Sequence, residues 1–117
     1  MKTLIKQEKI FKALSDKSRL RILKMLQNKK LCVCEIRTAL GLANSTVSQH
    51  LSILKDADLI LDEKDGKWIN YMINSNTSDK DTKNALLFVL LGLDDDETIQ
   101  KDKAGIEKTD RNIICCK

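Results

Sequence analysis

Residues 41–55 read GLANSTVSQHLSILK, and this stretch decides the fold. Val47, Leu51 and Leu54 recur at helical spacing and form one apolar stripe, whereas the opposite side carries small hydroxyls and an amide. Such a polar side is a poor core surface, but it is well suited to hydrogen-bonding base edges in the major groove of DNA. The stretch therefore predicts a helix that ends near Ala57 and contacts DNA.

A second helix is predicted just before this one, across a short turn. Residues 32–40 have helical character, and Gly41 suits the left-handed residue at which a helix ends. Residues 41–44 have the length of the turn in a helix-turn-helix motif, and Asn44 or Ser45 can cap the helix that follows. The two helices together predict a helix-turn-helix.

The surrounding pattern predicts two earlier helices and a later hairpin. Apolar spacing predicts a helix over residues 3–14 and another that is capped by Asp16 and runs to about Asn28. Two strand-like runs, 59–63 and 67–73, flank an Asp-Gly pair, which is a strong hairpin signal. This order predicts a mainly α fold with a small β-hairpin, a winged helix-turn-helix in which the hairpin is the wing.

The helix predicted over residues 78–93 carries more apolar surface than one small domain can cover. Its run 85–91 is apolar nearly all round, and such a helix needs burial on more than one side. We therefore expect a homodimer formed through the first and last helices. Residues 1–93 are predicted to form the DNA-binding and dimerisation domain. The polar residues 94–117 are predicted to form a flexible tail that ends in cysteines and is disordered over most of 95–114.

The charge of the chain is unevenly distributed. Residues 1–73 hold 14 Lys and Arg against 8 Asp and Glu, a net +6, whereas residues 74–117 hold 7 against 9, a net −2. These parts account for the +4 of the 117-residue chain. A basic region of this kind predicts an anionic partner, and double-stranded DNA is the candidate, although a solvated helix surface gives the same pattern.

Composition also excludes several classes of protein. The longest apolar run is seven residues, too short to cross a membrane, and the N-terminus has no secretory pattern, so we expect a cytoplasmic protein without a membrane partner. Thiols stay reduced there, which makes the four cysteines ligands, sensors or packing residues. A single histidine, with no phosphate-binding loop and no acid–base cluster, predicts that the protein is not an enzyme.

Four segments resemble the ArsR/SmtB family of metal-responsive repressors. LSDKSRLRIL (14–23) resembles a family segment in which proline is usual where Lys17 stands, and LCVCEI (31–36) resembles the thiolate box of arsenic, cadmium and lead sensors. STVSQHL (45–51) resembles the recognition helix, and GKW (66–68) resembles the wing. The resemblance implies a dimeric repressor that releases an inverted-repeat operator when an ion binds. It does not cover residues 95–117.

The box implies that Cys32 and Cys34 bind a soft ion as the inducer, trivalent arsenic or antimony, with cadmium or lead as alternatives. Residues two apart on a helix point about 200° away from each other, so both sulfurs can hold one ion only if the first helical turn unwinds. Since that helix is half of the DNA-reading pair, this distortion would weaken DNA binding. The alternative is that both are small buried residues at the start of a helix.

A third thiolate is missing from the usual places. Arg37 stands where some arsenic repressors have a cysteine, and residues 1–31 contain none. Cys115 and Cys116 are the remaining candidates, because a flexible tail of about 20 residues spans about 25 Å. The alternative is that they are incidental thiols.

The polar helix and the wing supply the candidate DNA contacts. Gln49 would suit adenine, and the wing lysines would suit phosphates, although an ordinary surface remains the alternative. The predicted DNA-binding residues are Asn44, Ser45, Thr46, Ser48, Gln49, His50, Ser52, Lys55, Lys64 and Lys67.

Two further functions use the same residues. A thiol redox switch on the same fold would respond to oxidation of the cysteine pairs instead of to an ion. Metal sequestration by the cysteine tail would make the fold incidental.

Overall fold

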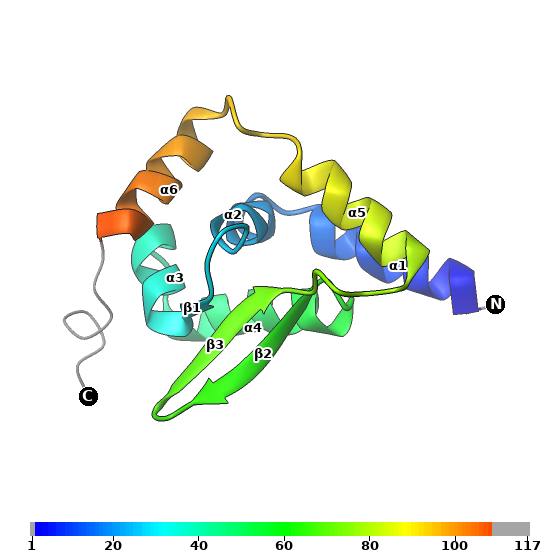
Figure 1. The fold of residues 1–117 in the computed structure, drawn as a ribbon, viewed down its shortest axis with the longest axis horizontal. Coiled ribbons are helices and arrows are strands. Elements are labelled where there is room, and N and C mark those ends of the chain that lie inside the picture. Colours follow the sequence, from blue (N-terminus) through cyan, green and yellow to red (C-terminus); the bar gives the residue numbers. More distant parts are fainter. Residues whose placement is uncertain (1, 109–117) are drawn as a thin grey trace.

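The computed structural model describes residues 2–108, which form an elongated, mainly helical molecule with a small sheet (Figure 1). The predicted winged helix-turn-helix, mainly α with a small hairpin, is confirmed. In chain order the elements are α1 (Lys2–Leu14), α2 (Lys17–Met25), β1 (Leu31–Cys32), α3 (Val33–Leu40), α4 (Asn44–Asp56), β2 (Ile60–Asp65), β3 (Trp68–Ile73), α5 (Lys80–Leu90) and α6 (Glu97–Lys108).

The helix ends follow from local chemistry. Asp16 caps α2, since its carboxylate accepts the backbone N–H of Arg19 at 3.1 Å, but α2 ends at Met25 rather than near residue 28. Gly41 ends α3 with φ at 70°, as its position predicted. The predicted cap of α4 is wrong: the N-cap is Ala43, without a side-chain hydrogen bond. Asn44 lies inside the helix instead.

The core forms where the apolar stripes of the helices meet. Val47, Leu51 and Leu54 of α4 are at most 1% exposed, which confirms the stripe that predicted this helix. Ile22 and Leu23 of α2 lie in the same cluster and are fully buried. Burial of this stripe fixes which side of α4 remains open to a ligand.

The sheet has three strands, one more than predicted. β3 lies in the middle and pairs antiparallel with β2 on one side and with β1 on the other. In the hairpin Asp65 pairs with Trp68, and Gly66 takes the left-handed conformation that the turn requires, with φ at 61°. The two residues of β1 are too few for a periodic signal, so the sequence indicated only a hairpin.

The prediction of a disordered tail over residues 95–114 is wrong at residues 97–108, because these residues form helix α6. Ile99 and Ile106 are 4% and 5% exposed, and α6 packs against α2 and α3. Between them Asp102, 6% exposed, accepts two hydrogen bonds of 2.9 Å from the guanidinium of Arg21. Because one buried position of α6 holds an aspartate, Asp102, the apolar pattern of this helix was too sparse to predict it from the sequence. Residues 109–117 lie outside the described part.

A buried lysine fixes the corner between α5 and α6. Lys24 of α2 is 1% exposed, and its Nζ donates to the carbonyl of Leu90 at 2.7 Å and to Asp94 at 2.9 Å. Gln27 donates to the same carbonyl at 3.0 Å. The hydrogen bond from Lys24 lowers the pKa of Asp94, so this carboxylate stays charged against the ammonium. The end of α5 is thereby tied to α2.

Candidate DNA-binding face and thiol site

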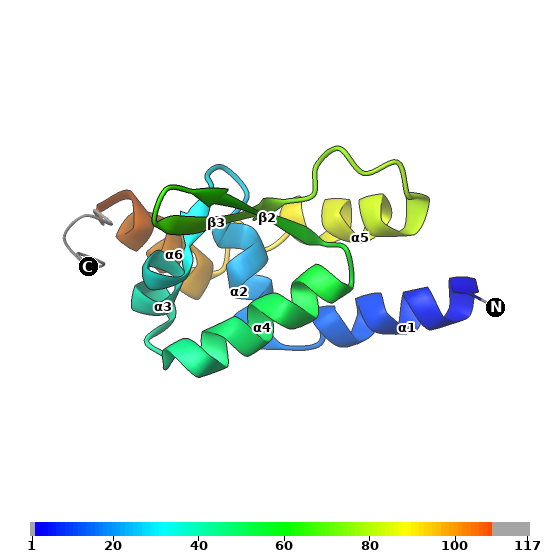
Figure 2. The ribbon, with the colours of Figure 1, turned by 90° about the horizontal axis from the view of Figure 1, so that it is seen from below.

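The side of α4 opposite the core carries most of the predicted DNA contacts. Figure 2 shows α4 running beside α1, next to the β2–β3 hairpin. The N-cap of this helix is Ala43, and no side-chain hydrogen bond caps the helix. The exposed members are Asn44, Ser45, Thr46, Ser48, Gln49 and Ser52.

His50 and Lys55 contact side chains of other elements, which the sequence did not predict. His50 is half-buried, and its Nδ1 lies 3.1 Å from the guanidinium of Arg19 and 3.8 Å from the carboxylate of Asp16. It therefore joins α4 to the start of α2. Lys55 is exposed, but its Nζ donates to Asp62 of β2 at 3.0 Å and so links α4 to the wing. A DNA contact by either residue stays a prediction.

The wing carries two exposed cations beside its turn. Lys64 and Lys67 lie on either side of Gly66, and both are exposed. The ammonium of Lys67 lies 5.0 Å from the centre of the Trp68 ring, which restrains it by a cation–π interaction. Two cations on a protruding hairpin suit the phosphates that flank a helix bound in the groove.

Replacing either wing lysine by alanine is expected to reduce the salt dependence of DNA binding. Each phosphate contact contributes a slope of about one to log Kobs against log salt, so K64A and K67A should each lower the slope by about one. Fluorescence anisotropy titrations of labelled DNA at several salt concentrations measure this slope. The control is K83A, because Lys83 is exposed on α5, away from the wing. Equal slopes in K64A, K67A and K83A would show that the wing does not contact phosphate.

The two box cysteines lie where strand β1 meets helix α3. Cys32 is 3% exposed and has an extended backbone, with φ at −91° and ψ at 170°. It is the N-cap of α3 and pairs with Asn70 of β3. Cys34 is the second residue of α3 and is half-buried. The prediction that both cysteines lie within the helix is wrong, because only Cys34 does, so the 200° separation does not apply.

Glu35 holds this junction in place. Its carboxylate accepts the backbone N–H of Cys32 at 2.9 Å, and its side chain is 3% exposed. This role of Glu35 was not predicted from the sequence, although an acid three residues after an N-cap has the spacing of a capping box. The buried carboxylate fixes the backbone of Cys32 relative to α3.

The described residues include two cysteine sulfurs, which are both thiolate donors for a soft ion only when Cys34 is reduced. Cys32 is buried and is not disulfide-bonded, whereas Cys34 takes part in a disulfide bond. Within residues 2–108 no group of three or more His, Cys, Asp and Glu could hold a metal ion. Arg37 follows Cys34 by one helical turn, but a guanidinium does not ligate. Cys115 and Cys116 lie outside the described residues, so a third sulfur would have to come from there.

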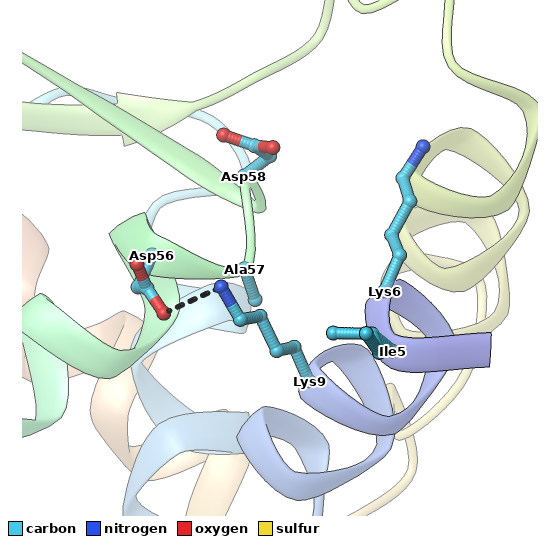
Figure 3. Close-up of a pocket in the computed structure, with 6 residues that line it drawn as sticks. All are labelled: Ile5, Lys6, Lys9, Asp56, Ala57 and Asp58. Atoms are coloured by element: carbon cyan, nitrogen blue, oxygen red, sulfur yellow. Dashed lines mark ion pairs between the residues drawn. The ribbon is translucent and has the colours of Figure 1, made fainter. Parts of the chain in front are cut away.

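A pocket lined mostly by charged residues lies between α1 and the end of α4 (Figure 3). Lys9 lies 3.4 Å from Asp56 within it, and Lys6 forms an ion pair with Asp79 next to α5. Two lysines and two aspartates lie on its walls, so their formal charges cancel. The pocket is lined by Ile5, Lys6, Lys9, Asp56, Ala57 and Asp58.

No helix within residues 2–108 combines the length and apolar character that crossing a bilayer requires.

Comparison with known proteins places these features in a family. Residues 16–61 match the family described as "Bacterial regulatory protein, arsR family". The chain is 41% identical over 66 residues to the arsenical resistance operon repressor of Escherichia coli K12, a match that covers 56% of each protein. It is 43% identical over 72 residues to the repressor of the same name in Bacillus subtilis 168, covering 61% of this chain and 69% of that protein. The chain thus spans about half the length of the first of these relatives.

Solved structures show the same fold. HlyU from Vibrio cholerae N16961 is similar with a TM-score of 0.62 and 30% identity, covering 75% of this chain and 91% of that chain. The homodimeric winged helix-turn-helix DNA-binding domain of Mb0332 from Mycobacterium bovis has a TM-score of 0.64 and 28% identity, covering 76% and 79%. With the helix-turn-helix, the wing and the cysteine box in place, the chain belongs to the arsR family of bacterial regulatory proteins.

Proposed function

We propose that this protein is a homodimeric transcriptional repressor that leaves its operator when its thiolates bind trivalent arsenic or antimony. The observation that carries the proposal is the place of Cys32, which is at once the N-cap of α3 and a strand residue beside the wing. An ion bound there acts directly on the elements that hold the DNA-reading helix.

Binding to operator DNA is supported by the open side of α4. It carries hydroxyls and two amides opposite a fully buried apolar stripe, and two lysines lie at the wing. A two-fold symmetric dimer would present two such helices, so the operator is expected to be an inverted repeat with half-sites about one helical turn apart. Relatives of the chain are named as repressors of arsenical resistance operons.

Dimerisation through α1 and α5 is supported by an apolar surface that this chain leaves open. Phe88, Leu91, Leu4 and Phe11 are 83%, 77%, 74% and 68% exposed. A groove between α1 and α5 is lined largely by Ile10, Phe11, Leu14, Ala85 and Phe88, so each copy offers both rings and a groove to receive them. Such a surface suits the isologous contact of a two-fold dimer. We call the exposed residues Leu4, Phe11, Phe88 and Leu91 the dimer face.

The coupling between ion and DNA follows from the two cysteine positions. Cys32 is held by the backbone bond to Glu35 and by its pairing with β3, so any shift of Cys32 on ion binding acts on both contacts. That movement disturbs the start of α3 and the edge of β3 together. A coupling of about 1–3 kcal/mol would weaken operator binding by roughly 5–150-fold.

The chemistry of the ion follows from the donors. Sulfur ligands favour soft ions, among which are trivalent arsenic, trivalent antimony, cadmium and lead. A curated relative is the cadmium resistance transcriptional regulatory protein CadC of Listeria innocua, 39% identical over 66 residues. Arsenic is our choice because two relatives with 41% and 43% identity are arsenical resistance repressors.

Replacing both box cysteines by serine is expected to preserve DNA binding and to abolish release by arsenite. C32S/C34S keeps small polar side chains at both positions, so α3 and α4 stay folded while the sulfur donors are lost. The measurement is anisotropy of labelled DNA from upstream of the gene, bound to reduced protein and titrated with arsenite. T38S is the control, because serine retains the hydroxyl that donates to the carbonyl of Cys34.

Each result of this titration assigns the ion response differently. Release of wild type and T38S, but not of C32S/C34S, supports the proposal. Equal release of C32S/C34S would rule out the box as the arsenite site. Release of wild type by cadmium or lead alone would transfer the function to those ions.

Thiol oxidation is the second candidate input, and the disulfide bond of Cys34 favours it. Oxidation at this position would also fix one sulfur at the start of α3 and so act on the same elements. Release of the reduced protein from DNA by peroxide, without any response to arsenite, would support this candidate over the ion sensor.

A further inference from the structure

Helix α5 is held at both of its ends by lysines that belong to other helices. At its start Asp79 caps the helix and also forms an ion pair with Lys6 of α1. At its end the carbonyl of Leu90, which has no partner within the helix, accepts a hydrogen bond of 2.7 Å from the ammonium of Lys24 in α2. The tilt of α5 against α1 and α2 is therefore set by two charged contacts as well as by packing.

The contact at the end of α5 is directional. Gln27 of α2 donates to the same carbonyl of Leu90 at 3.0 Å, and the ammonium of Lys24 also donates to Asp94 at 2.9 Å. Apolar packing has no preferred direction and lets one helix slide on another, whereas two donors aimed at one carbonyl hold it in one place. Burying an ammonium is costly, and an apolar side chain of similar length would fill the space without that cost. Lys24 therefore contributes position rather than burial.

The carbonyl that is held in this way lies within the dimer face. Phe88 comes two residues before Leu90 and Leu91 comes one residue after it, and both are largely exposed. Helix α2 packs against α5 and also against α4, with Ile22 and Leu23 in the core cluster that contains the stripe of α4 (Figure 2). Any movement of α5 on α2 thus moves the dimer face relative to α4.

The separation of the two α4 helices in a dimer depends on the tilt of α5. This helix has 11 residues and is about 16 Å long, so a swing of about 10° around its start moves its end by about 3 Å. That shift is close to the rise of one base pair, which is about 3.4 Å. A dimer can therefore distinguish half-sites that differ by one base pair in spacing only if the end of α5 is held.

We propose that Lys24, together with Gln27, sets the half-site spacing that the dimer accepts, by holding the end of α5 against α2. This proposal rests on the proposed dimeric repressor and adds a determinant of its choice of DNA. Lys24 is a positioning residue, because it acts through the dimer face on the separation of the two α4 helices.

The variant K24M tests this proposal, because methionine fills the space of the lysine stem but donates no hydrogen bond. Wild-type protein first selects its sites from a pool of DNA duplexes with a random centre, which gives the half-site sequence and its spacing. Anisotropy titrations then measure the affinity for this site and for copies whose spacing is longer or shorter by one and two base pairs. The control is I22V, which trims a fully buried side chain of the same helix and leaves both donors to Leu90 in place.

Wild type is expected to prefer one spacing sharply. A spacing that prevents the second half-site from binding removes the gain of roughly 10²–10⁴-fold that linked binding provides. In K24M this preference should shrink by about tenfold or more, while I22V keeps the profile of wild type. A purely structural role would lower the melting temperature and weaken binding at every spacing by the same factor. An unchanged spacing profile in K24M would therefore overturn the proposal.

The variant Q27L keeps the proposal testable if K24M does not fold. Gln27 is half-buried, and leucine removes the second donor to the carbonyl of Leu90 without exposing the core. Q27L should flatten the spacing profile in the same direction as K24M, and a profile equal to that of wild type would count against the proposal. Light scattering checks that each variant is a dimer, and a monomeric K24M would show that Lys24 maintains the dimer rather than its geometry.

The wild-type results separate this proposal from the proposed function. If wild type is a dimer with one preferred spacing, and K24M and Q27L share that spacing, only the positioning role fails. If wild type is a monomer or selects single half-sites, the proposed dimeric repressor fails and the positioning role falls with it.

Discussion

Replacing Phe88 by glutamate is expected to leave the protein monomeric and to weaken its binding to operator DNA by about 100-fold or more. Phe88 is 83% exposed, the largest exposed fraction among the residues of the dimer face. A glutamate there would have to be buried in the proposed interface, and burying an unpaired charge is strongly unfavourable. A monomer reaches one half-site only and loses the gain of roughly 10²–10⁴-fold that linked binding provides.

Molar mass by light scattering and anisotropy titration of operator DNA measure the two effects of F88E. The control is K83E, which places a glutamate on an exposed polar position of the same helix. Circular dichroism of F88E should show the helical content of wild type, because the residue is exposed within one protomer. A variant that remains dimeric would show that subunits associate through another surface.

Replacing Asp102 by alanine is expected to destabilise the fold by about 3 kcal/mol. Removing one partner of a buried ion pair costs about 3–5 kcal/mol, because the other charge is left unpaired, and the partial exposure of Arg21 places the value at the lower end. The hydrogen bonds that Arg21 donates to Asp102 raise the pKa of Arg21 above its already high ordinary value. An arginine is protonated in proteins in any case, so the guanidinium would stay charged without Asp102. For a domain of this size the melting temperature should fall by about 10 °C.

A double-mutant cycle identifies the cause of this loss. R21A/D102A has no unpaired charge, so it should be more stable than D102A alone, whereas E107A on the exposed side of α6 should resemble wild type. Thermal unfolding is measured at one protein concentration, since a dimer gains stability with concentration. If D102A melts like E107A, the ion pair does not hold α6 in solution.

The parts of this fold that the sequence predicted are those with repeated, local signals. The stripe of Val47, Leu51 and Leu54 defined α4, the Asp-Gly pair defined the hairpin, and Gly41 marked the end of α3. The polar side of α4 could be predicted for the same reason, since it is what remains opposite the buried stripe. The contact of His50 with Arg19 could not, because it joins residues 31 apart in sequence.

The missed elements depend on partners that are distant in sequence. Helix α6 has few buried apolar residues, and the buried carboxylate of Asp102 reads as surface until it is placed opposite Arg21, 81 residues earlier. Strand β1 is two residues long and exists because β3 supplies its partners. Among the missed elements, β1 has the largest effect on the thiol site, because it places Cys32 on extended backbone and joins the cysteine box to the wing.

The burial of Lys24 gives the molecule a place where chemical reagents do not reach. Its ammonium is enclosed between the end of α5 and Asp94, whereas most other lysines of the described chain are exposed. Acylating reagents need an accessible, neutral amine, and trypsin needs an open backbone, so neither acts at this lysine while the corner is closed. Acylation of Lys24, or tryptic cleavage after it, would therefore report that α5 and α6 have separated from α2.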